Sequence, residues 1–468
     1  MPNCTRRIGG AALGSATILL EWIDAATREM TLFAAAGFLI GGVDDLLVDL
    51  VWLVRRAWRR GGGTATLDEL PAPTTPRRFA IFVPAWDESA VIGAMLRTTL
   101  ARLDHPAFRI FVGCYPNDRA TIDAVADAAA GDARVVLVIG ERPGPTTKAD
   151  CLNNLWNALA RASEPVDAIV LHDAEDVVHP AELRLFDALL DAHAAVQIPV
   201  LPLPRAESPL VAGHYSGEFA EAHGKELVVR TALKAALPFA GVGCAIRIEA
   251  LAALAAGHGT PFDAQSVTED YELGLRLAAA GHAAHFARVR ERPGGAVIAV
   301  REYFPATVNA AVRQKARWMT GIALAGWDRL GWGRALDLGD HWMRLRDRRA
   351  TLAVIVLAAG YAALVGWGLS LAGHALFGGA TPEPPAPLQA ILAANLALLL
   401  WRAMWRTAFT ARSYGWREAC WAPSRMVVGN FIALLAARRA VMRYAGLLAG
   451  RAPQWDKTAH AYPAEIVP

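Results

Sequence analysis

Short apolar runs alternate with longer amphipathic stretches between about residues 77 and 300. Apolar residues at nearly every position of a short run are typical of strands buried on both faces of a parallel sheet. Alternation of such strands with helices predicts an α/β domain, in which ligands bind at the carboxyl ends of the strands. The predicted strands are 79–83, 109–113, 135–139, 168–171 and 194–200, and helices are expected at 90–103, 121–130 and 149–161.

Long apolar stretches lie outside this region. Residues 31–53, 351–377 and 388–405 are each long enough to cross a bilayer. The first carries Asp44, Asp45 and Asp49. We expect a span whose acidic face packs on other helices, and the alternative is an interfacial helix end. Residues 11–20 predict a membrane-associated helix, and residues 426–437 are short enough to favour an interfacial one.

The composition agrees with a membrane-bound protein. Of the 468 residues, 54% are hydrophobic and only 19% are charged, and the net charge of +3 offers no argument for nucleic acid. Arginines cluster at 55–60 and 344–349 beside two of the apolar stretches, which indicates the cytoplasmic side. The five cysteines are scattered without metal-ligand spacing, so we expect reduced core residues.

Six segments follow from these patterns. The Gly61–Gly63 run and the prolines after it indicate a linker between the first membrane segment and the α/β domain. The segments are 1–60, N-terminal membrane helices; 61–76, linker; 77–300, α/β domain; 301–349, interfacial helices; 350–407, transmembrane hairpin; and 408–468, amphipathic helix and cytoplasmic tail.

Two carboxylates follow the predicted strand 168–171. Asp173 and Glu175 offer oxygen ligands at a spacing that suits Mg²⁺ or Mn²⁺ on a diphosphate. A turn in which an aspartate bonds to the nearby backbone would have the same sequence. Beside these carboxylates, His172 and His179 are expected to be surface histidines, and the alternative is that one of them is a further metal ligand.

A second acidic motif begins a predicted helix. Thr268 is expected to cap the helix, with Glu269 and Asp270 in its first turn. Capping alone explains these residues, but a general base at a helix start would have the same sequence. Asp270 is the candidate base, and the helix dipole there is expected to favour its ionised form.

A third motif lies on one helical face. Gln314, Arg317 and Trp318 are spaced i, i+3, i+4. Arg317 suits diphosphate oxygens and Trp318 suits stacking on a sugar, although an amphipathic helix on a membrane would show the same pattern.

Two further loops follow strands. Residues Pro84–Glu88, with Asp87, end the first strand, where a nucleotide base and ribose would lie. Lys148 and Asp150 open a helix whose N-terminus suits phosphate. Gly241 and Gly243 are expected to allow an acceptor to approach the backbone closely.

Taken together, these motifs resemble those of membrane-bound family-2 glycosyltransferases of the cellulose-synthase-like kind. The resemblance implies a GT-A (nucleotide-diphospho-sugar transferase) fold over about residues 77–330, flanked by transmembrane and interfacial helices. It assigns the donor to Pro84, Asp87, Glu88, Lys148, Asp150 and Asp173, the metal to Asp173 and Glu175, the base to Asp270 beside Glu269, and the clamp to Gln314, Arg317 and Trp318.

A narrower resemblance is to the phage adsorption protein B group of bacterial inner-membrane glycosyltransferases. It rests on the stretches Val83–Trp86, Tyr115–Asp118, Thr147–Asn153, Glu302–Pro305 and Trp455–His460. Tyr115–Asp118 departs from the usual uridine loop, and Asp118 is expected to replace part of it.

The resemblance implies an inverting enzyme of the inner membrane, multi-pass, with its catalytic domain in the cytoplasm. It would use a UDP-sugar and Mn²⁺ or Mg²⁺, and the acceptor would be a growing glycan or exopolysaccharide, or a lipid-linked one. Expected partners are the bilayer and an outer-membrane export component, with no nucleic acid. The alternatives are transfer to a lipid phosphate carrier and a non-catalytic membrane scaffold of an export or phage-adsorption system.

Overall fold

The computed structural model describes residues 4–58, 64–73, 75–162, 165–453 and 460–463. The chain forms two compact units. One unit comprises residues 1–51 and 349–405, and the other comprises residues 52–348 and 406–468. Of the stretches named above, residues 455–459 lie outside the described part of the chain.

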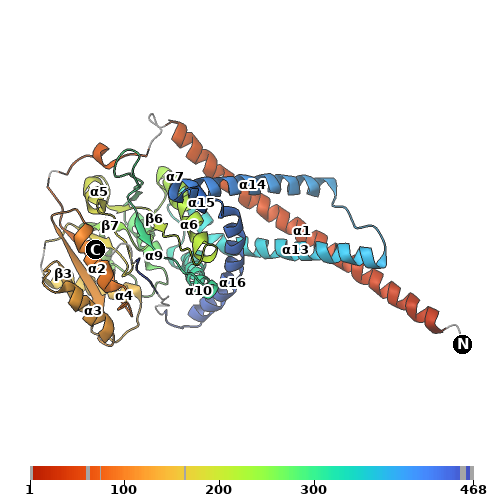
Figure 1. Cartoon of the computed structure of the whole chain (residues 1–468), viewed down its shortest axis with the longest axis horizontal. Coiled ribbons are helices and arrows are strands. Elements are labelled where there is room, and N and C mark those ends of the chain that lie inside the picture. Colours follow the sequence, from red (N-terminus) through yellow and green to blue (C-terminus); the bar gives the residue numbers. More distant parts are fainter. Residues whose placement is uncertain (1–3, 59–63, 74, 163–164, 454–459, 464–468) are drawn as a thin grey trace. The chain divides into compact units, whose positions relative to one another are not determined.

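The larger unit is built on a seven-stranded sheet with the order β3-β2-β1-β4-β7-β5-β8 (Figure 1). β1 pairs in parallel with β2 and β4, while β7 runs antiparallel to both of its neighbours. β6 and β9 form a separate parallel pair. The strands are β1 (Phe79–Pro84), β2 (Phe108–Cys114), β3 (Val135–Ile139), β4 (Ala168–Leu171), β5 (Ala195–Gln197), β6 (Val200–Pro202), β7 (Cys244–Arg247), β8 (Ala284–Phe286) and β9 (Val300–Glu302).

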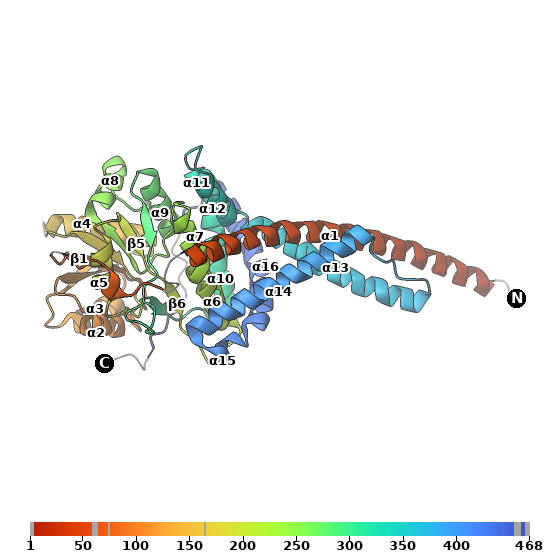
Figure 2. The ribbon, with the colours of Figure 1, turned by 90° about the horizontal axis from the view of Figure 1, so that it is seen from above.

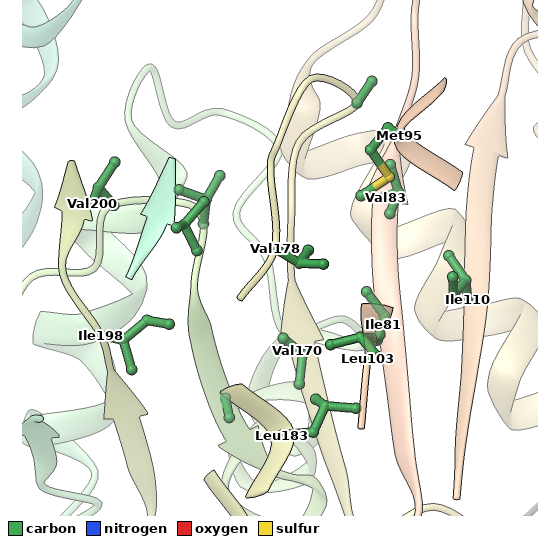
Figure 3. Packing of buried hydrophobic residues seen from close by; sticks show 14 of the residues in the cluster. Ile81, Val83, Met95, Leu103, Ile110, Val170, Val178, Leu183, Ile198 and Val200 are labelled. Atoms are coloured by element: carbon green, nitrogen blue, oxygen red, sulfur yellow. The ribbon is translucent and has the colours of Figure 1, made fainter. Parts of the chain in front are cut away.

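Helices cover both faces of the sheet, as apolar strands require. α2 (Ile92–Arg102), α3 (Arg119–Ala129) and α5 (Glu182–Leu189) contribute to one core cluster, and α4 (Lys148–Ala162), α8 (Ile248–His258) and α9 (Glu269–Ala279) to the other. Ile81 and Val83 point to the first face, where they lie beside Ile110, Met95 and Val170 (Figure 3). Ala80 and Phe82 belong to the second cluster, because successive residues of a strand face opposite sides.

Further helices pack against this α/β core. α16 lies against α6, α10 and η3, and its buried face combines small residues such as Gly429, Ala436 and Ala440 with the larger Arg425 and Ile432. These helices are α6 (Val211–Glu221), η2 (Ala222–Glu226), α7 (Leu227–Ala232), α10 (Val308–Trp318), η3 (Met319–Ala325), α11 (Gly326–Leu330), α12 (Leu338–Arg348), α15 (Trp416–Ala419) and α16 (Ala422–Leu448).

The smaller unit is helical. α1 (Cys4–Trp58), α13 (Ala350–Phe377) and α14 (Ala386–Tyr414) run beside one another in both views (Figures 1 and 2). By length and composition, α13 and α14 could each cross a membrane. The predicted stretch 31–53 forms part of α1, and its crossing of a membrane stays a prediction.

The acidic residues of α1 are paired within this unit. Asp44 and Asp45 lie 2.7 and 2.6 Å from the guanidinium nitrogens of Arg349, and the Trp401 indole donates to Asp49 Oδ2 at 2.8 Å. The expectation that this acidic face packs on other helices is confirmed. Charges in an apolar setting need such partners.

Several sequence expectations need correction. The sheet is mixed, because β7 runs against its neighbours. The linker contributes to the core: the 3₁₀ turn η1 (Leu67–Glu69) buries Leu67, whose amide donates to Arg290 at 2.9 Å. α16 is much longer than the predicted 426–437. Arg344 and Arg348 of the arginine cluster at 344–349 are buried in α12, and the cytoplasmic position of this cluster stays a prediction.

Two helical glycines give a matched test of this packing. An added Cβ at Gly274 of α9 would lie 2.1 Å from the carbonyl oxygen of Leu237, whereas at Gly257 of α8 it would meet nothing within 4 Å. We expect Gly274→Ala to destabilise the protein by about 3 kcal/mol, at the upper end for overpacking. Gly257→Ala should stabilise it by about 0.5–1 kcal/mol. Denaturant unfolding of the purified chain in detergent measures both, and equal midpoints would contradict this packing.

Candidate active site

The turn after β4 is held by a buried ion-pair chain. Both ring nitrogens of His172 lie 2.7 Å from a carboxylate, Nδ1 from Asp176 and Nε2 from Glu182. Asp176 also accepts from the Asp173 amide at 3.0 Å. Burial alone would lower the pKa of His172, but Glu182 and Asp176 raise it to about 10. The expectation of a surface histidine is therefore wrong, because His172 anchors the acidic turn from below.

Lys148 joins two of the acidic motifs. Its Nζ lies 2.5 Å from Asp173 Oδ1 and 3.9 Å from Glu269 Oε1. Burial opposes the charge of this lysine, but Asp173, Glu269 and Asp270 together raise its pKa above the ordinary value. The ammonium group of Lys148, the first residue of α4, therefore contacts both the turn after β4 and the start of α9.

Gly241 lies directly against this cluster, with a positive φ of 81°. A Cβ there would be 2.8 Å from Asp270 Oδ2 and 3.3 Å from Lys148 Nζ. Because Gly241 has no side chain, the side chains of Asp270 and Lys148 fit beside it. From the sequence we had expected this space to admit an acceptor.

The start of α9 carries two carboxylates that share a buried environment. Burial and the neighbouring Asp270 raise the pKa of Glu269 to about 7, although Lys148 opposes the shift. Burial also raises the pKa of Asp270, while Lys148 and Arg317 lower it. The expected effect of the helix dipole on Asp270 is therefore outweighed by burial. Thr268 occupies the N-cap position, but its side chain makes no capping hydrogen bond. A carboxylate whose pKa lies near neutrality, as that of Glu269 does, is suited to accept a proton.

The helix α10 brings the third motif to the same place. The positive charge of Arg317 lowers the pKa of both Glu269 and Asp270. Trp318 packs in an aromatic group with Tyr215, Phe219 and Phe304, at ring-centroid distances of 6.0, 6.2 and 6.5 Å. Among the described residues, the buried Oε1 of Gln314 has no hydrogen-bond partner.

The loops assigned to the donor lie together at the ends of β1 and β2. Asp118 caps α3 by accepting from the Thr121 amide at 3.3 Å, and its other oxygen accepts from the Asp87 amide at 2.5 Å. Asp87 itself has a positive φ of 54°. Asp150 accepts from the Thr146 hydroxyl at 2.8 Å. Asp118 thus stabilises the loop that follows Pro84, the last residue of β1, and Asp150 stabilises the loop before α4.

A group suited to a metal ion lies beside these loops. Ligand atoms of Glu88, Glu175 and His460 all lie within 4.8 Å of one another. His460 Nδ1 is 2.9 Å from Glu88 Oε1 and 3.1 Å from Glu175 Oε1. Asp173 is not a member of this group, because its carboxylate lies on Lys148.

His460 was missed as a site residue from the sequence. It ends the Trp455–His460 stretch, which served only as a mark of resemblance. Glu302 is a second addition: burial, together with Asp176 and Glu175, raises its pKa well above the ordinary value. β9 brings it there through the bridge between Arg301 and Val177.

Comparisons with known proteins agree with this arrangement. A family model described as glycosyltransferase-like family 2 matches residues 76–321. The chain is 36% identical over 455 residues to bacteriophage adsorption protein B of Escherichia coli K12 and, at the same identity, to bacteriophage N4 adsorption protein B of E. coli O157:H7. Each alignment covers 91% of this chain but only 61% of the relative.

A solved structure shares the fold. It is the mannosyltransferase PcManGT from Pyrobaculum calidifontis in complex with GDP-Man and Mn²⁺, with a TM-score of 0.54 and 18% identity. The match covers 85% of this chain and 99% of that one. The predicted GT-A fold is thereby confirmed.

The ion-pair chain below the acidic turn can be tested by its contribution to stability. Removing one partner of a buried charge pair costs about 3–5 kcal/mol, since the other charge is left unpaired. We therefore expect His172→Ala to lower the denaturant midpoint clearly, and Glu182→Gln to lower it less. His282→Ala serves as the control, because this half-exposed histidine follows the far end of α9. Equal midpoints for the His172 and His282 variants would contradict the anchoring role.

Proposed function

The chain belongs to glycosyltransferase-like family 2, and from this premise we propose that it moves a sugar from a nucleotide-diphosphate donor to an acceptor hydroxyl, with inversion at the anomeric carbon. The donor is a UDP-sugar, and the acceptor is a growing glycan or exopolysaccharide at the bacterial inner membrane. The relatives are longer than this chain, so their activity is part of the proposal.

One observation carries the proposal. Lys148, Asp173, the Glu269–Asp270 pair and Arg317 come from four separate parts of the chain and interact at a single site. Sugar transfer needs a base beside the acceptor hydroxyl and positive charge beside the leaving diphosphate. This cluster offers both at the carboxyl end of β4.

The proposed step uses these groups as follows. Asp270 accepts the proton of the acceptor hydroxyl, whose oxygen forms the bond to the anomeric carbon. The bond from that carbon to the diphosphate oxygen breaks, and the nucleoside diphosphate leaves with the electron pair. Lys148 and Arg317 stabilise the charge that develops on the departing oxygens.

A divalent metal, Mn²⁺ or Mg²⁺, fits the acidic pocket beside this cluster. Glu175 is buried and, among the described residues, its Oε2 has no hydrogen-bond partner, nor does Asp176 Oδ1. Glu175, with Asp173 close by on the same turn, would hold the ion. When bound, such an ion supplies positive charge to the leaving diphosphate.

The membrane setting is also proposed. α13 and α14 each contain a stretch long and apolar enough to cross a membrane, which supports a multi-pass protein. The catalytic domain would lie in the cytoplasm, on the side of the arginines that border the apolar stretches. The acceptor would be carried by the bilayer, and a lipid phosphate is included among the candidates. An outer-membrane export partner would receive the product.

Nucleotide release from a panel of donors tests the function. The purified chain in detergent is incubated with UDP-sugars, Mn²⁺ and candidate acceptors, and GDP-mannose is included because PcManGT was solved with it. Turnover of a UDP-sugar supports the proposal, and turnover of GDP-mannose alone would overturn the donor assignment. Binding without turnover across all donors and acceptors would favour the alternative, a non-catalytic scaffold.

Asp270→Asn tests the base. The variant keeps the shape of the side chain but removes its basicity, so we expect turnover to fall by roughly two to four decades. Donor binding, followed by calorimetry, should stay nearly intact. Glu269→Gln is the matched control and should cost much less. If Glu269→Gln instead shows the larger loss, Glu269 is the base; loss of donor affinity and folding together would indicate a structural role.

A further inference from the structure

The last turns of α1 and α14 belong to the larger unit, where both pack against η2. The rings of Trp52 on α1 and Phe409 on α14 lie 5.5 Å apart. The Trp52 indole donates to the Gly224 carbonyl at 3.2 Å, and a Cβ at Gly224 would be 2.6 Å from Phe409. Arg56 and Arg412 come one helical turn after these two aromatic residues. The two helices therefore bring one arginine each to this junction.

The segment after β8 brings two more arginines to the same place. His223 of η2 packs on Phe286, the last residue of β8, with ring centroids 5.7 Å apart. Burial lowers the pKa of His223 to about 4, and the charge of Arg288 adds to this shift. Arg288 Nη1 also donates to the Thr64 hydroxyl at 3.3 Å, on the chain that follows α1. Four arginines, called the junction arginines below, thus come from three segments: Arg56, Arg288, Arg290 and Arg412.

No carboxylate balances the junction arginines within the described ranges of the chain. None of the four forms an ion pair there, although Arg288 and Arg290 are half-buried. Burial, together with the positive charges of the other three junction arginines, lowers the pKa of Arg288 to about 10. By contrast, Arg406 on α14 pairs with Glu221 at 2.5 Å. Like charges held together out of water are costly unless an opposite charge joins them.

We propose that the junction arginines bind a phosphate group, and that this group belongs to the headgroup of an anionic phospholipid. Guanidinium groups present planar sets of donors that match the oxygens of a phosphate. A bound phosphate supplies the negative charge that the described residues do not provide. The site is separate from the proposed sugar transfer and does not depend on it.

The distances along α1 and α14 favour a lipid over a free anion. Arg56 comes three residues after the apolar stretch 31–53, and Arg412 comes seven residues after the stretch 388–405. At the helical rise these positions are about 5 and about 10 Å beyond the apolar stretches. The headgroup region of a leaflet is about 5–8 Å thick, and long arginine side chains extend toward it. If α1 and α14 span the bilayer as proposed, both guanidinium groups reach the level of the lipid phosphates.

Two simpler roles for these arginines make different predictions. Basic residues beside a membrane span are expected from its orientation alone, and every exposed arginine nearby would then attract anionic lipid alike. An arginine required for the fold would lower the stability of the chain when it is removed. In a binding site, in contrast, removal of Arg288 relieves repulsion in the lipid-free chain and weakens only the binding of lipid.

Unfolding midpoints of the full chain in a neutral detergent distinguish these roles. Phosphatidylglycerol should raise the midpoint of the wild type, because a ligand of the folded state stabilises it, and phosphatidylcholine with the same acyl chains should raise it less. Arg288→Gln should have an unchanged or higher midpoint without lipid and should lose most of the increase with phosphatidylglycerol. In native mass spectrometry, the first phosphatidylglycerol should bind this variant about tenfold more weakly, as expected for a lost charged hydrogen bond.

Arg417→Gln is the matched control, because it removes an exposed arginine from α15, five residues after Arg412. It should leave the response to phosphatidylglycerol unchanged, and a loss equal to that of Arg288→Gln would overturn the proposal. If Arg288→Gln lowers the lipid-free midpoint, the exposed Arg412 decides the matter: Arg412→Gln should weaken phosphatidylglycerol binding several-fold, and unchanged binding would contradict the site.

Inorganic phosphate and diphosphate, added at matched ionic strength, distinguish a free anion from a lipid. Stabilisation by diphosphate equal to that by phosphatidylglycerol would overturn the lipid assignment. All of these measurements are made without sugar donor. A chain that turns over no donor would therefore leave the phosphate site intact, and a lipid response indifferent to Arg288 and Arg412 would remove the site and leave the transfer.

Discussion

The carboxylates after β4 are the constraint on which the site depends. Asp173, Glu175 and Asp176 lie on one turn, with Asp176 fully buried and Glu175 nearly so. A buried charge is tolerated only beside an opposite charge or a hydrogen-bond donor. One partner is local, His172 directly before the turn, whereas Lys148 comes from α4 and His460 from the tail. Pairing of these carboxylates therefore requires that separate segments of the chain lie together at one site.

The same burial shapes the acid–base properties of the neighbouring motif. Glu269 and Asp270 are adjacent and half-buried, and desolvation together with the charge of Asp270 disfavours the ionised form of Glu269. Lys148 and Arg317 work in the opposite direction. The balance brings the pKa of Glu269 to about 7, far above that of an exposed glutamate. Proton affinity at this site is thus set by the density of charge around it rather than by any one residue.

Charge pairing also organises the helical unit, by the same physical rule. Arg349, at the start of α13, neutralises both Asp44 and Asp45 on α1, and Trp401 on α14 satisfies Asp49. Small residues let the helices approach: an added Cβ at Gly37 would lie 2.5 Å from Val356. Polar pairs and close backbone contact are the means by which helices associate where the hydrophobic effect offers little.

Local pattern was sufficient for much of this protein. The largely apolar runs at 79–83, 109–113, 135–139 and 168–171 became β1 to β4. This composition suits β1, β2 and β4, which are buried on both faces, while the edge strand β3 is only partly buried. The apolar lengths of α13 and α14 could be predicted in the same way. The order of the acidic and Arg-Trp motifs carried the resemblance to the family that the family model then showed.

The tertiary structure alone decided how these parts meet. The antiparallel direction of β7 depends on a chain reversal that the short segment Cys244–Arg247 does not encode. His172 is buried, and the two carboxylates of the turn have different partners: Asp173 pairs with Lys148, and Glu175 pairs with His460. Both features depend on which side chains surround the turn. His460 is positioned by contacts with residues, such as Glu88, that are hundreds of positions away in the sequence. Sequence specifies which groups are available, whereas long-range packing determines which charges are buried together and hence what chemistry they can perform.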